Sequence, residues 1–150
     1  MGGGPSGCAA ATAAAREGAK TLLMEGTGAL GGMGTSGLLN AWCPFTDGEK
    51  IIYKGIAERV FSESKKGVPH IHYDNWVPIN GEYLKVVYDD LVTSEGVSVL
   101  FFTTMAAVEM KQNSPDSHML RKLRLHGNPS TSAAPDRAEH NSPFPSDLLP

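Results

Sequence analysis

The sequence predicts an α/β fold, and three features of its first 110 residues carry that prediction. A glycine-rich opening, Gly2–Gly7, leads into an alanine-rich segment that favours a helix, since alanine has the highest helix propensity. The short apolar run Lys20–Glu25 follows at strand length. Later, an amphipathic helical pattern ends at Gly96 and precedes the β-branched and aromatic run Val97–Phe102, a second strand. Helices that alternate with strands are typical of this class.

Capping signals and apolar spacing define three helices. The first begins near Pro5, because proline suits an initial helical turn, and ends before Gly18. Apolar residues four or five apart over residues 50–64 predict the second. The third covers Glu82–Ser94, is capped by Asn80, and has apolar residues at i, i+3, i+4, i+7 and i+8.

Composition excludes several classes of protein. Thirteen Lys and Arg against sixteen Asp and Glu leave a net charge of -3, which argues against a nucleic-acid surface. No apolar run reaches the length of a membrane span, and we expect no membrane partner. The opening lacks the basic and apolar regions of a secretory signal. The two cysteines make no disulfide framework, so we expect a reducing, cytoplasmic setting.

The glycines at the start form a phosphate-binding pattern. Gly2, Gly4 and Gly7 are spaced as G-x-G-x-x-G. In such a pattern the first glycine permits a tight turn, the second lets the backbone approach a pyrophosphate, and the third lets the helix pack closely on the sheet. The helix that follows presents free N–H groups and its positive dipole end to the phosphates.

Glu25 completes the pattern. It ends the next strand at close to the roughly 20-residue spacing at which an acidic residue accepts hydrogen bonds from a ribose diol. Two other interpretations stay open. The opening could be a flexible Gly/Ala segment beside an unrelated surface acid, and residues 1–6 also fit the M-G-x-x-x-S signal for N-myristoylation.

These motifs, with a second glycine-rich loop, carry a family resemblance. The second loop contains Leu30, Gly31, Gly32 and Met33. Together with the opening, it resembles the N-terminus of the FAD-dependent oxidoreductases of the glutathione-reductase-like superfamily. The resemblance covers about the first 110 residues and implies a Rossmann-like FAD-binding fold with FAD as cofactor.

The resemblance also implies roles for residues. The candidates for the pyrophosphate are in the opening: Gly2, Gly3, Gly4, Pro5 and Ser6, with Gly7 packing the helix. Glu25 would hold the adenosine ribose. The flavin side of the pyrophosphate and the ribitol would lie along the second loop, at Gly31, Gly32 and Met33. The adenine would lie near the backbone of Met105 and Ala106. Since the flavin carries the redox chemistry, no catalytic acid or base is assigned.

The sequence also departs from the family pattern. Family members have an apolar strand before the first glycine, whereas Met1 alone precedes Gly2 here, so we expect an incomplete fold without its first strand. We therefore expect the chain alone to fold poorly, to purify without flavin and to be inactive. Residues 1–110 would form the partial FAD-binding domain. Residues 111–150 hold six of the ten prolines and no apolar period, which predicts a disordered or aberrant tail.

Two rival functions stay open. One is a non-enzymatic remnant without stable flavin binding. The other is an NAD(P)-binding dehydrogenase domain, which the Gly31–Met33 loop disfavours because simple nicotinamide domains do not need it. Substrate, electron acceptor and oligomeric state do not follow from the sequence.

Several conspicuous residues have ordinary interpretations. His70 and His72 could share a strand face, but no third ligand lies near them in sequence, so we expect no metal site.

Cys8 is a packing residue of the first helix, and Cys43 is a loop or core cysteine without a C-x-x-C partner. The remaining candidates are Trp42 and Trp76 as half-buried side chains, rather than flavin contacts, and Arg121–Arg124 as a solvated charge run.

Overall fold

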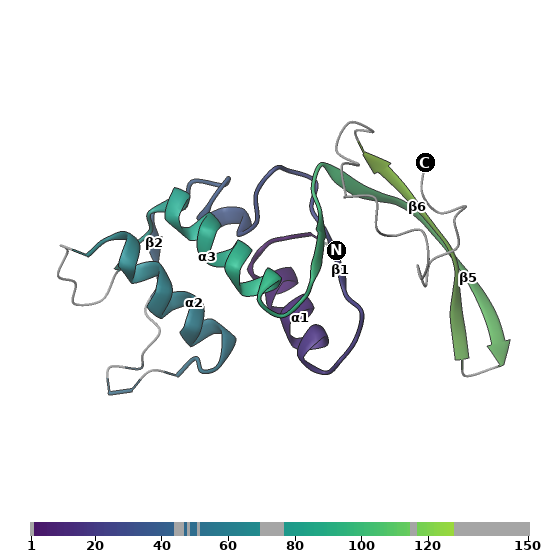
Figure 1. Ribbon diagram of the computed structural model, residues 1–150, viewed down its shortest axis with the longest axis horizontal. Helices are drawn as coiled ribbons and strands as arrows, with labels where there is room; N and C mark the ends of the chain where they lie inside the picture. Colours follow the sequence, from purple (N-terminus) through teal and green to yellow (C-terminus); the bar gives the residue numbers. More distant parts are fainter. Residues whose placement is uncertain are drawn as a thin grey trace.

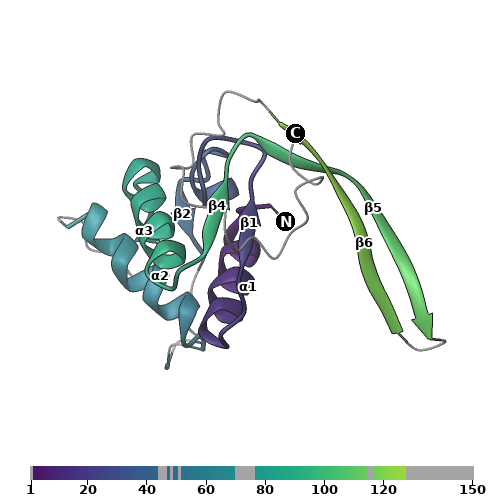
Figure 2. The ribbon, with the colours of Figure 1, turned by 45° about the vertical axis from the view of Figure 1, so that its right-hand side comes forward.

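The computed structural model describes residues 2–43, 47, 49–50, 52–69, 77–114 and 117–127. In chain order the elements are α1 (Pro5–Arg16), β1 (Leu22–Met24), the 3-10 turn η1 (Gly32–Gly34), β2 (Ala41–Trp42), α2 (Ile56–Ser64), the 3-10 turn η2 (Lys65–Gly67), β3 (Val77–Pro78), α3 (Gly81–Thr93), β4 (Ser98–Leu100), β5 (Thr103–Ser114) and β6 (Ser117–Gly127). The three helices lie side by side, and β1 and β4 run along them (Figures 1 and 2).

The helices begin where the capping signals place them, with one correction. Gly4 is the extended N-cap of α1 and Pro5 occupies its first turn. Asn80 caps α3, because its Oδ1 accepts a hydrogen bond from the Tyr83 N–H at 3.1 Å. The second helix is shorter than the expected 50–64: α2 begins at Ile56. Gly55 is its N-cap, and glycine in a helix interior would be unfavourable.

The sheet that supports the site is parallel, which confirms the α/β class. In β1 and β4, Leu22 pairs with Ser98 and Met24 with Leu100. The pairing continues past both strands, since the Glu25 N–H donates to Leu100 O and the Thr103 N–H to Glu25 O, both at 2.9 Å. Glu25 is therefore held at the carboxyl end of β1, the edge at which parallel α/β sheets bind ligands.

The opposite edge of β1 contacts the start of the chain. The Met24 carbonyl accepts a hydrogen bond from the Gly2 N–H at 2.8 Å. Successive carbonyls along a strand point to alternate sides, so this bond lies away from β4. It positions the first glycine loop beside the end of β1, one residue before Glu25.

One core joins the helices to the sheet. Its fully buried side chains include Cys8 of α1, Leu23 of β1, and Leu84, Leu91 and Val92 of α3. At the far end of the helices, Glu95 accepts from Arg16 at 2.7 Å and lies 3.5 Å from Arg59, linking α1 and α2 to the end of α3. Core packing and this ion-pair cluster together fix α1, and hence its N-terminus, relative to α3.

The structure describes part of the segment after residue 110. Residues 111–114 continue β5, which pairs antiparallel with β6 over Ser117–Gly127, and the disordered or aberrant tail over residues 111–150 stays a prediction. Backbone hydrogen bonds of an antiparallel pair do not depend on side-chain hydrophobicity, so a polar segment can form such a ribbon. The ribbon extends away from the helices (Figures 1 and 2). Residues 128–150 lie outside the described part of the chain, and the domain boundary at residue 110 stays a prediction.

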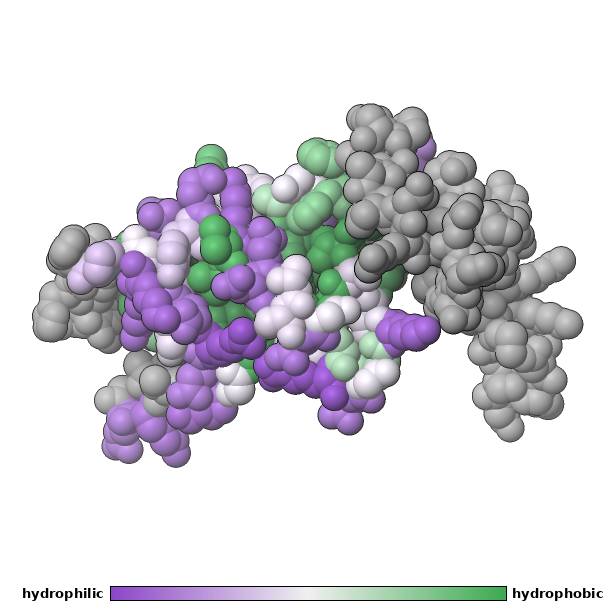
Figure 3. All heavy atoms as spheres, in the orientation of Figure 1, coloured by the Kyte–Doolittle hydropathy of each residue, from purple (hydrophilic) through white to green (hydrophobic). Residues whose placement is uncertain are grey.

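The visible face of the molecule divides by polarity. Hydrophilic residues dominate over α2 and α3, whereas hydrophobic ones gather over β1 and β4 (Figure 3). Leu22 of β1 is 37% exposed. Within the described ranges, no helix has both the length and the apolar character needed to cross a membrane.

Candidate functional site

The two glycine-rich loops, which the sequence predicted separately, contact each other directly. The Gly3 carbonyl accepts a hydrogen bond from the Gly31 N–H at 2.8 Å and a second from the Cys8 thiol at 3.1 Å. A Cβ added to Gly32 would lie 3.2 Å from the Gly4 Cα, so the backbones meet with no room for a side chain. The loops therefore form one continuous surface beside the N-terminus of α1.

Gly3 and Gly4 have opposite surroundings. Gly3 is buried, and an added Cβ would overlap the Leu30 side chain and come 3.1 Å from Glu25 Oε2. A Cβ at Gly4 would meet nothing within 4 Å. Gly3 thus serves internal packing, a role that the G-x-G-x-x-G pattern did not assign, whereas Gly4 faces open space on the side from which a ligand would approach.

The N-terminus of α1 supplies hydrogen-bond donors. Pro5 has no N–H, and the first intrahelical bond runs from the Cys8 N–H to Gly4 O at 2.9 Å. The N–H groups of Ser6 and Gly7 therefore have no intrahelical acceptor. Ser6 is exposed, and no side chain caps the helix. These free donors and the positive dipole end form an anion-binding position.

The second loop adds further free amides. Gly31 and Gly32 have φ values of 96° and 54°, which lead into the 3-10 turn η1. Thr35 fixes this shape, since its hydroxyl donates to Leu30 O at 2.7 Å and contacts Gly32 O at 3.2 Å. In the described part of the chain, the N–H groups of Gly32 and Met33 have no protein acceptor. Met33 is 63% exposed.

Gly31 is confined on both sides. A Cβ there would come 2.6 Å from the Thr35 methyl and 2.7 Å from the Tyr88 ring of α3. Its positive φ is also a conformation that side chains rarely adopt. Glycine is thus required at this position by packing and by backbone conformation together.

Glu25 is bound by the first loop. Its Oε2 accepts from the Gly3 N–H at 2.6 Å, and its Oε1 accepts from the N–H and the hydroxyl of Thr27, both at 2.8 Å. Partial burial would raise the pKa of this carboxyl, but the hydrogen bonds from Thr27 and Gly3 outweigh it, and the pKa is lowered. Glu25 is therefore an anionic acceptor at neutral pH, and Oε2 keeps capacity for another donor.

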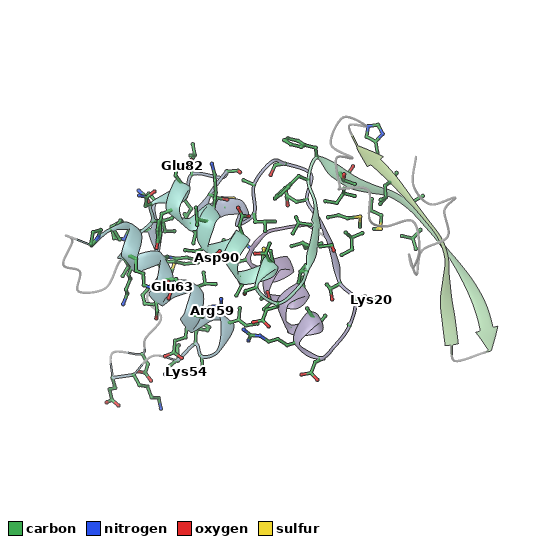
Figure 4. All side chains as sticks on the ribbon, viewed as in Figure 1. Lys20, Lys54, Arg59, Glu63, Glu82 and Asp90 are labelled. Carbon is green, nitrogen blue, oxygen red and sulfur yellow. The ribbon has the colours of Figure 1, made fainter. Side chains whose placement is uncertain are left out.

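The site carries almost no charge of its own. Residues 2–15 and 26–43 contain no Asp, Glu, Lys or Arg, so Glu25 is the charged residue between the loops. Charged side chains instead occupy α2 and α3, among them Arg59, Glu63 and Asp90 (Figure 4). An anion would consequently be bound by backbone N–H groups and the helix dipole rather than by cationic side chains.

Sequence reasoning missed two contributors. Thr27 orients Glu25, and its position two residues after the acid is a local signal for a side-chain hydrogen bond. Cys8 does more than pack: it donates to the Gly3 carbonyl, and burial raises the pKa of its thiol to about 11. A thiol that stays protonated is a poor nucleophile, so its role is structural.

The remaining candidate residues belong to other elements or lie outside the described part of the chain. Trp42 is half-buried, donates from Nε1 to Ser64 Oγ at 2.9 Å and packs edge-on against Phe61. Met105 is exposed on β5, and Ala106 lies at a register shift of the ribbon. Cys43 is exposed. The residues His70, His72 and Trp76 lie outside the described ranges. Within those ranges, no group of three or more His, Cys, Asp or Glu could hold a metal ion.

Comparison with known families and structures gives two findings. The family model described as FAD dependent oxidoreductase matches residues 1–133. Among solved structures, THI4 of Thermovibrio ammonificans is similar with a TM-score of 0.53 at 15% identity, over 84% of this chain and 45% of that one. The Diels-Alderase PyrE3 of pyrroindomycin biosynthesis gives a TM-score of 0.48 at 15% identity, over 81% of this chain and 28% of that one.

The similarity to THI4 supports the fold, and the match covers only part of the THI4 chain. The chain corresponds to less than half of the THI4 chain that it matches. No curated protein sequence matches at a significant level. The match of the family model covers all of β6, past the boundary at residue 110 that the resemblance suggested.

Proposed function

Because the chain belongs to the FAD-dependent oxidoreductase family, with FAD as its cofactor, we propose that its two joined glycine loops form the cradle for the FAD pyrophosphate in a flavin-dependent redox enzyme. The observation that carries the proposal is the hydrogen bond between Gly31 N–H and Gly3 O. It brings the free amides of the second loop next to the N-terminus of α1, so donors from two segments converge on one position.

The cradle divides between the loops. The phosphates would approach the unobstructed backbone at Gly4. They would accept hydrogen bonds from the Ser6 and Gly7 N–H groups, which lie at the positive end of the α1 dipole. The N–H groups of Gly32 and Met33 would bind the flavin side of the pyrophosphate and the ribitol. The Gly2, Gly3 and Pro5 backbone would position this turn, with Gly2 anchored on Met24.

Glu25 would hold the adenosine ribose. It lies at the end of β1, has a lowered pKa, and is already oriented by Gly3 and Thr27. Oε2 can accept a further hydrogen bond, and the Thr27 hydroxyl can turn toward solvent when a ribose hydroxyl takes its place on Oε1. The adenosine would then lie over Gly26–Gly28, on the same side as β5.

FAD supplies the redox chemistry when bound, and the protein's residues bind and orient it. No described side chain is assigned as an acid or base. The substrate is unidentified, and the glutathione-reductase-like subclass and the cytoplasmic setting stay predictions. Fold alone does not name a reaction, because one fold can support many different activities.

The test is titration of the purified chain with FAD, followed by visible absorption and by calorimetry. The proposal requires saturable binding of one FAD, with perturbed flavin absorption bands, and this result would overturn the expectation that the chain alone folds poorly. NAD(H) and NADP(H) are titrated in parallel. Binding of a nicotinamide cofactor in place of FAD would support the dehydrogenase alternative, and binding of neither would support a chain without stable cofactor binding.

A further inference from the structure

An apolar cavity lies behind the proposed cradle, between the helices. Its volume is about 140 Å³. It is lined from four elements: Pro5 and Ala9 of α1, Trp42 of β2, Ala57 of α2, and Tyr88 and Leu91 of α3. All these side chains except the Tyr88 hydroxyl and the Trp42 indole nitrogen are apolar, so the cavity differs in chemistry from the anion-binding loops that it adjoins.

The cavity exists because small residues face each other across it. Ala9 and Ala57 are too short to fill the space between α1 and α2. Trp42 cannot turn to fill it without losing its hydrogen bond to Ser64 at 2.9 Å and its edge contact with Phe61, whose ring centroid is 6.4 Å away. Ala57 is exposed, which places it where the cavity opens.

Tyr88 gives the cavity a polar group. The residue is only 3% exposed and lines the cavity, and no hydrogen bond of its hydroxyl is found among the described residues. Thr12 Oγ1 is the buried side-chain oxygen among the described residues that has no hydrogen bond and no access to solvent, so the Tyr88 hydroxyl is not sealed in this way. Burial raises the pKa of this phenol, which keeps it a hydrogen-bond donor.

We propose that this cavity binds a small, neutral, monocyclic aromatic molecule with one oxygen, of the size of phenol, hydrogen-bonded to Tyr88. An apolar cavity of about 150 Å³ in another protein accepts one benzene ring, so the volume suits a single ring. The Trp42 and Tyr88 rings favour an aromatic occupant. An unpaired buried hydroxyl favours a ligand that can hydrogen-bond to it.

The bound molecule would lie directly behind the cradle. Pro5 is the first residue of α1, and the Tyr88 ring packs on Gly31 of the second loop. The cavity therefore shares walls with the cradle without using its free amides. This inference goes beyond the proposed function, and it can be tested with no FAD present.

The experiment titrates the whole chain with phenol and, separately, with toluene, which has the same shape without the hydroxyl. Calorimetry should show saturable binding of one molecule of phenol with a dissociation constant on the order of 1 mM. Tyr88→Phe should weaken phenol about five- to tenfold, the effect of one hydrogen bond, and leave toluene unchanged. Ala57→Leu should abolish binding of both, and the matched exposed variant Ala13→Leu should change neither.

Three results would overturn the proposal: no saturable binding of phenol, which means that the cavity holds water only; equal affinity of Tyr88→Phe and the original chain for phenol; or unchanged binding in Ala57→Leu. Circular dichroism checks that each variant is folded. If Ala57→Leu does not fold, Tyr88→Phe still decides the question, because it removes a single oxygen.

Discussion

Gly4 and Gly3 are adjacent glycines with different physical roles, and substitutions can separate these roles. A Cβ at Gly4 meets no protein atom within 4 Å, whereas one at Gly3 overlaps Leu30. Gly4→Val should therefore leave the fold intact and abolish FAD binding, because its side chain would occupy the space of the pyrophosphate. Gly3→Val should instead destabilise the fold itself.

Calorimetric titration with FAD and thermal unfolding, measured on both variants, check this prediction. Ala13→Val, an exposed position on α1, controls for adding a β-branched residue to this region. Unchanged FAD affinity in a folded Gly4→Val variant would show that the pyrophosphate does not pass this residue.

Glu25 connects the ribose position to the stability of the first loop. Glu25→Gln keeps the shape of the side chain but removes the charge that strengthens hydrogen bonds from ribose hydroxyls. FAD affinity should fall by about one order of magnitude, since hydrogen bonds to charged groups contribute roughly 1.5–3 kcal/mol. Titration of both proteins at pH 7 measures this difference, and equal dissociation constants would assign Glu25 to the loop alone.

The same carboxylate predicts a pH dependence. Its pKa in the folded chain is lowered from the ordinary value of 4.5. A lowered pKa means that the ionised group stabilises the fold above about pH 4.5, and that this contribution is lost as pH falls through the lowered value. Urea unfolding of the original chain and Glu25→Gln should thus differ at pH 7 and converge in acid. A constant difference across this range would contradict the assignment.

At the scale of elements, α3 is positioned by its N-cap and by its contacts with the second loop. Asn80 accepts from the Tyr83 N–H at 3.1 Å and donates to Gly67 O at 3.2 Å, which ties α3 to the turn after α2. Asn80→Ala should lower the free energy of unfolding by about 1 kcal/mol, the usual cost of a lost cap. Asn80→Ser keeps the cap acceptor and should recover most of this loss.

Urea denaturation measures the two Asn80 variants. If both lose the same stability, the bond to Gly67 rather than the cap is the stabilising contact. Because Tyr88 of α3 packs on Gly31, a weakened α3 should also loosen the second glycine loop. FAD affinity of Asn80→Ala should therefore fall while its loop residues are unchanged.

At the scale of the whole molecule, FAD binding and folding should be coupled. The cradle joins residues that are far apart in sequence, so it exists in the folded chain and not in the unfolded one. FAD at about 100 times its dissociation constant should raise the free energy of unfolding by about 2.7 kcal/mol. Thermal unfolding with and without FAD checks this, and Gly4→Val should show no increase. An equal increase in that variant would place FAD elsewhere.

Local sequence was sufficient for much of the fold and of the candidate site. The starts of α1 and α3, the strand that ends beside Glu25, and the two glycine loops depend on capping, propensity and spacing within a few residues, and such signals are readable without a structure. The extent of α2 was predicted wrongly, and the β5–β6 ribbon was not foreseen. Apolar spacing alone did not register that the helix begins only after Gly55, and strand pairing does not require an apolar period.

The tertiary structure decided the contacts between segments that are distant in sequence. The sequence by itself determined that residues 2–7, Glu25 and residues 31–33 are candidates to bind a dinucleotide. Only the fold showed that Gly31 donates to Gly3, that Gly3 rather than Gly4 is packed, and that Tyr88 lies behind the loop beside a cavity. The reason is physical: propensity and capping act between neighbours along the chain, whereas packing and inter-loop hydrogen bonds depend on which surfaces meet when the whole chain is folded.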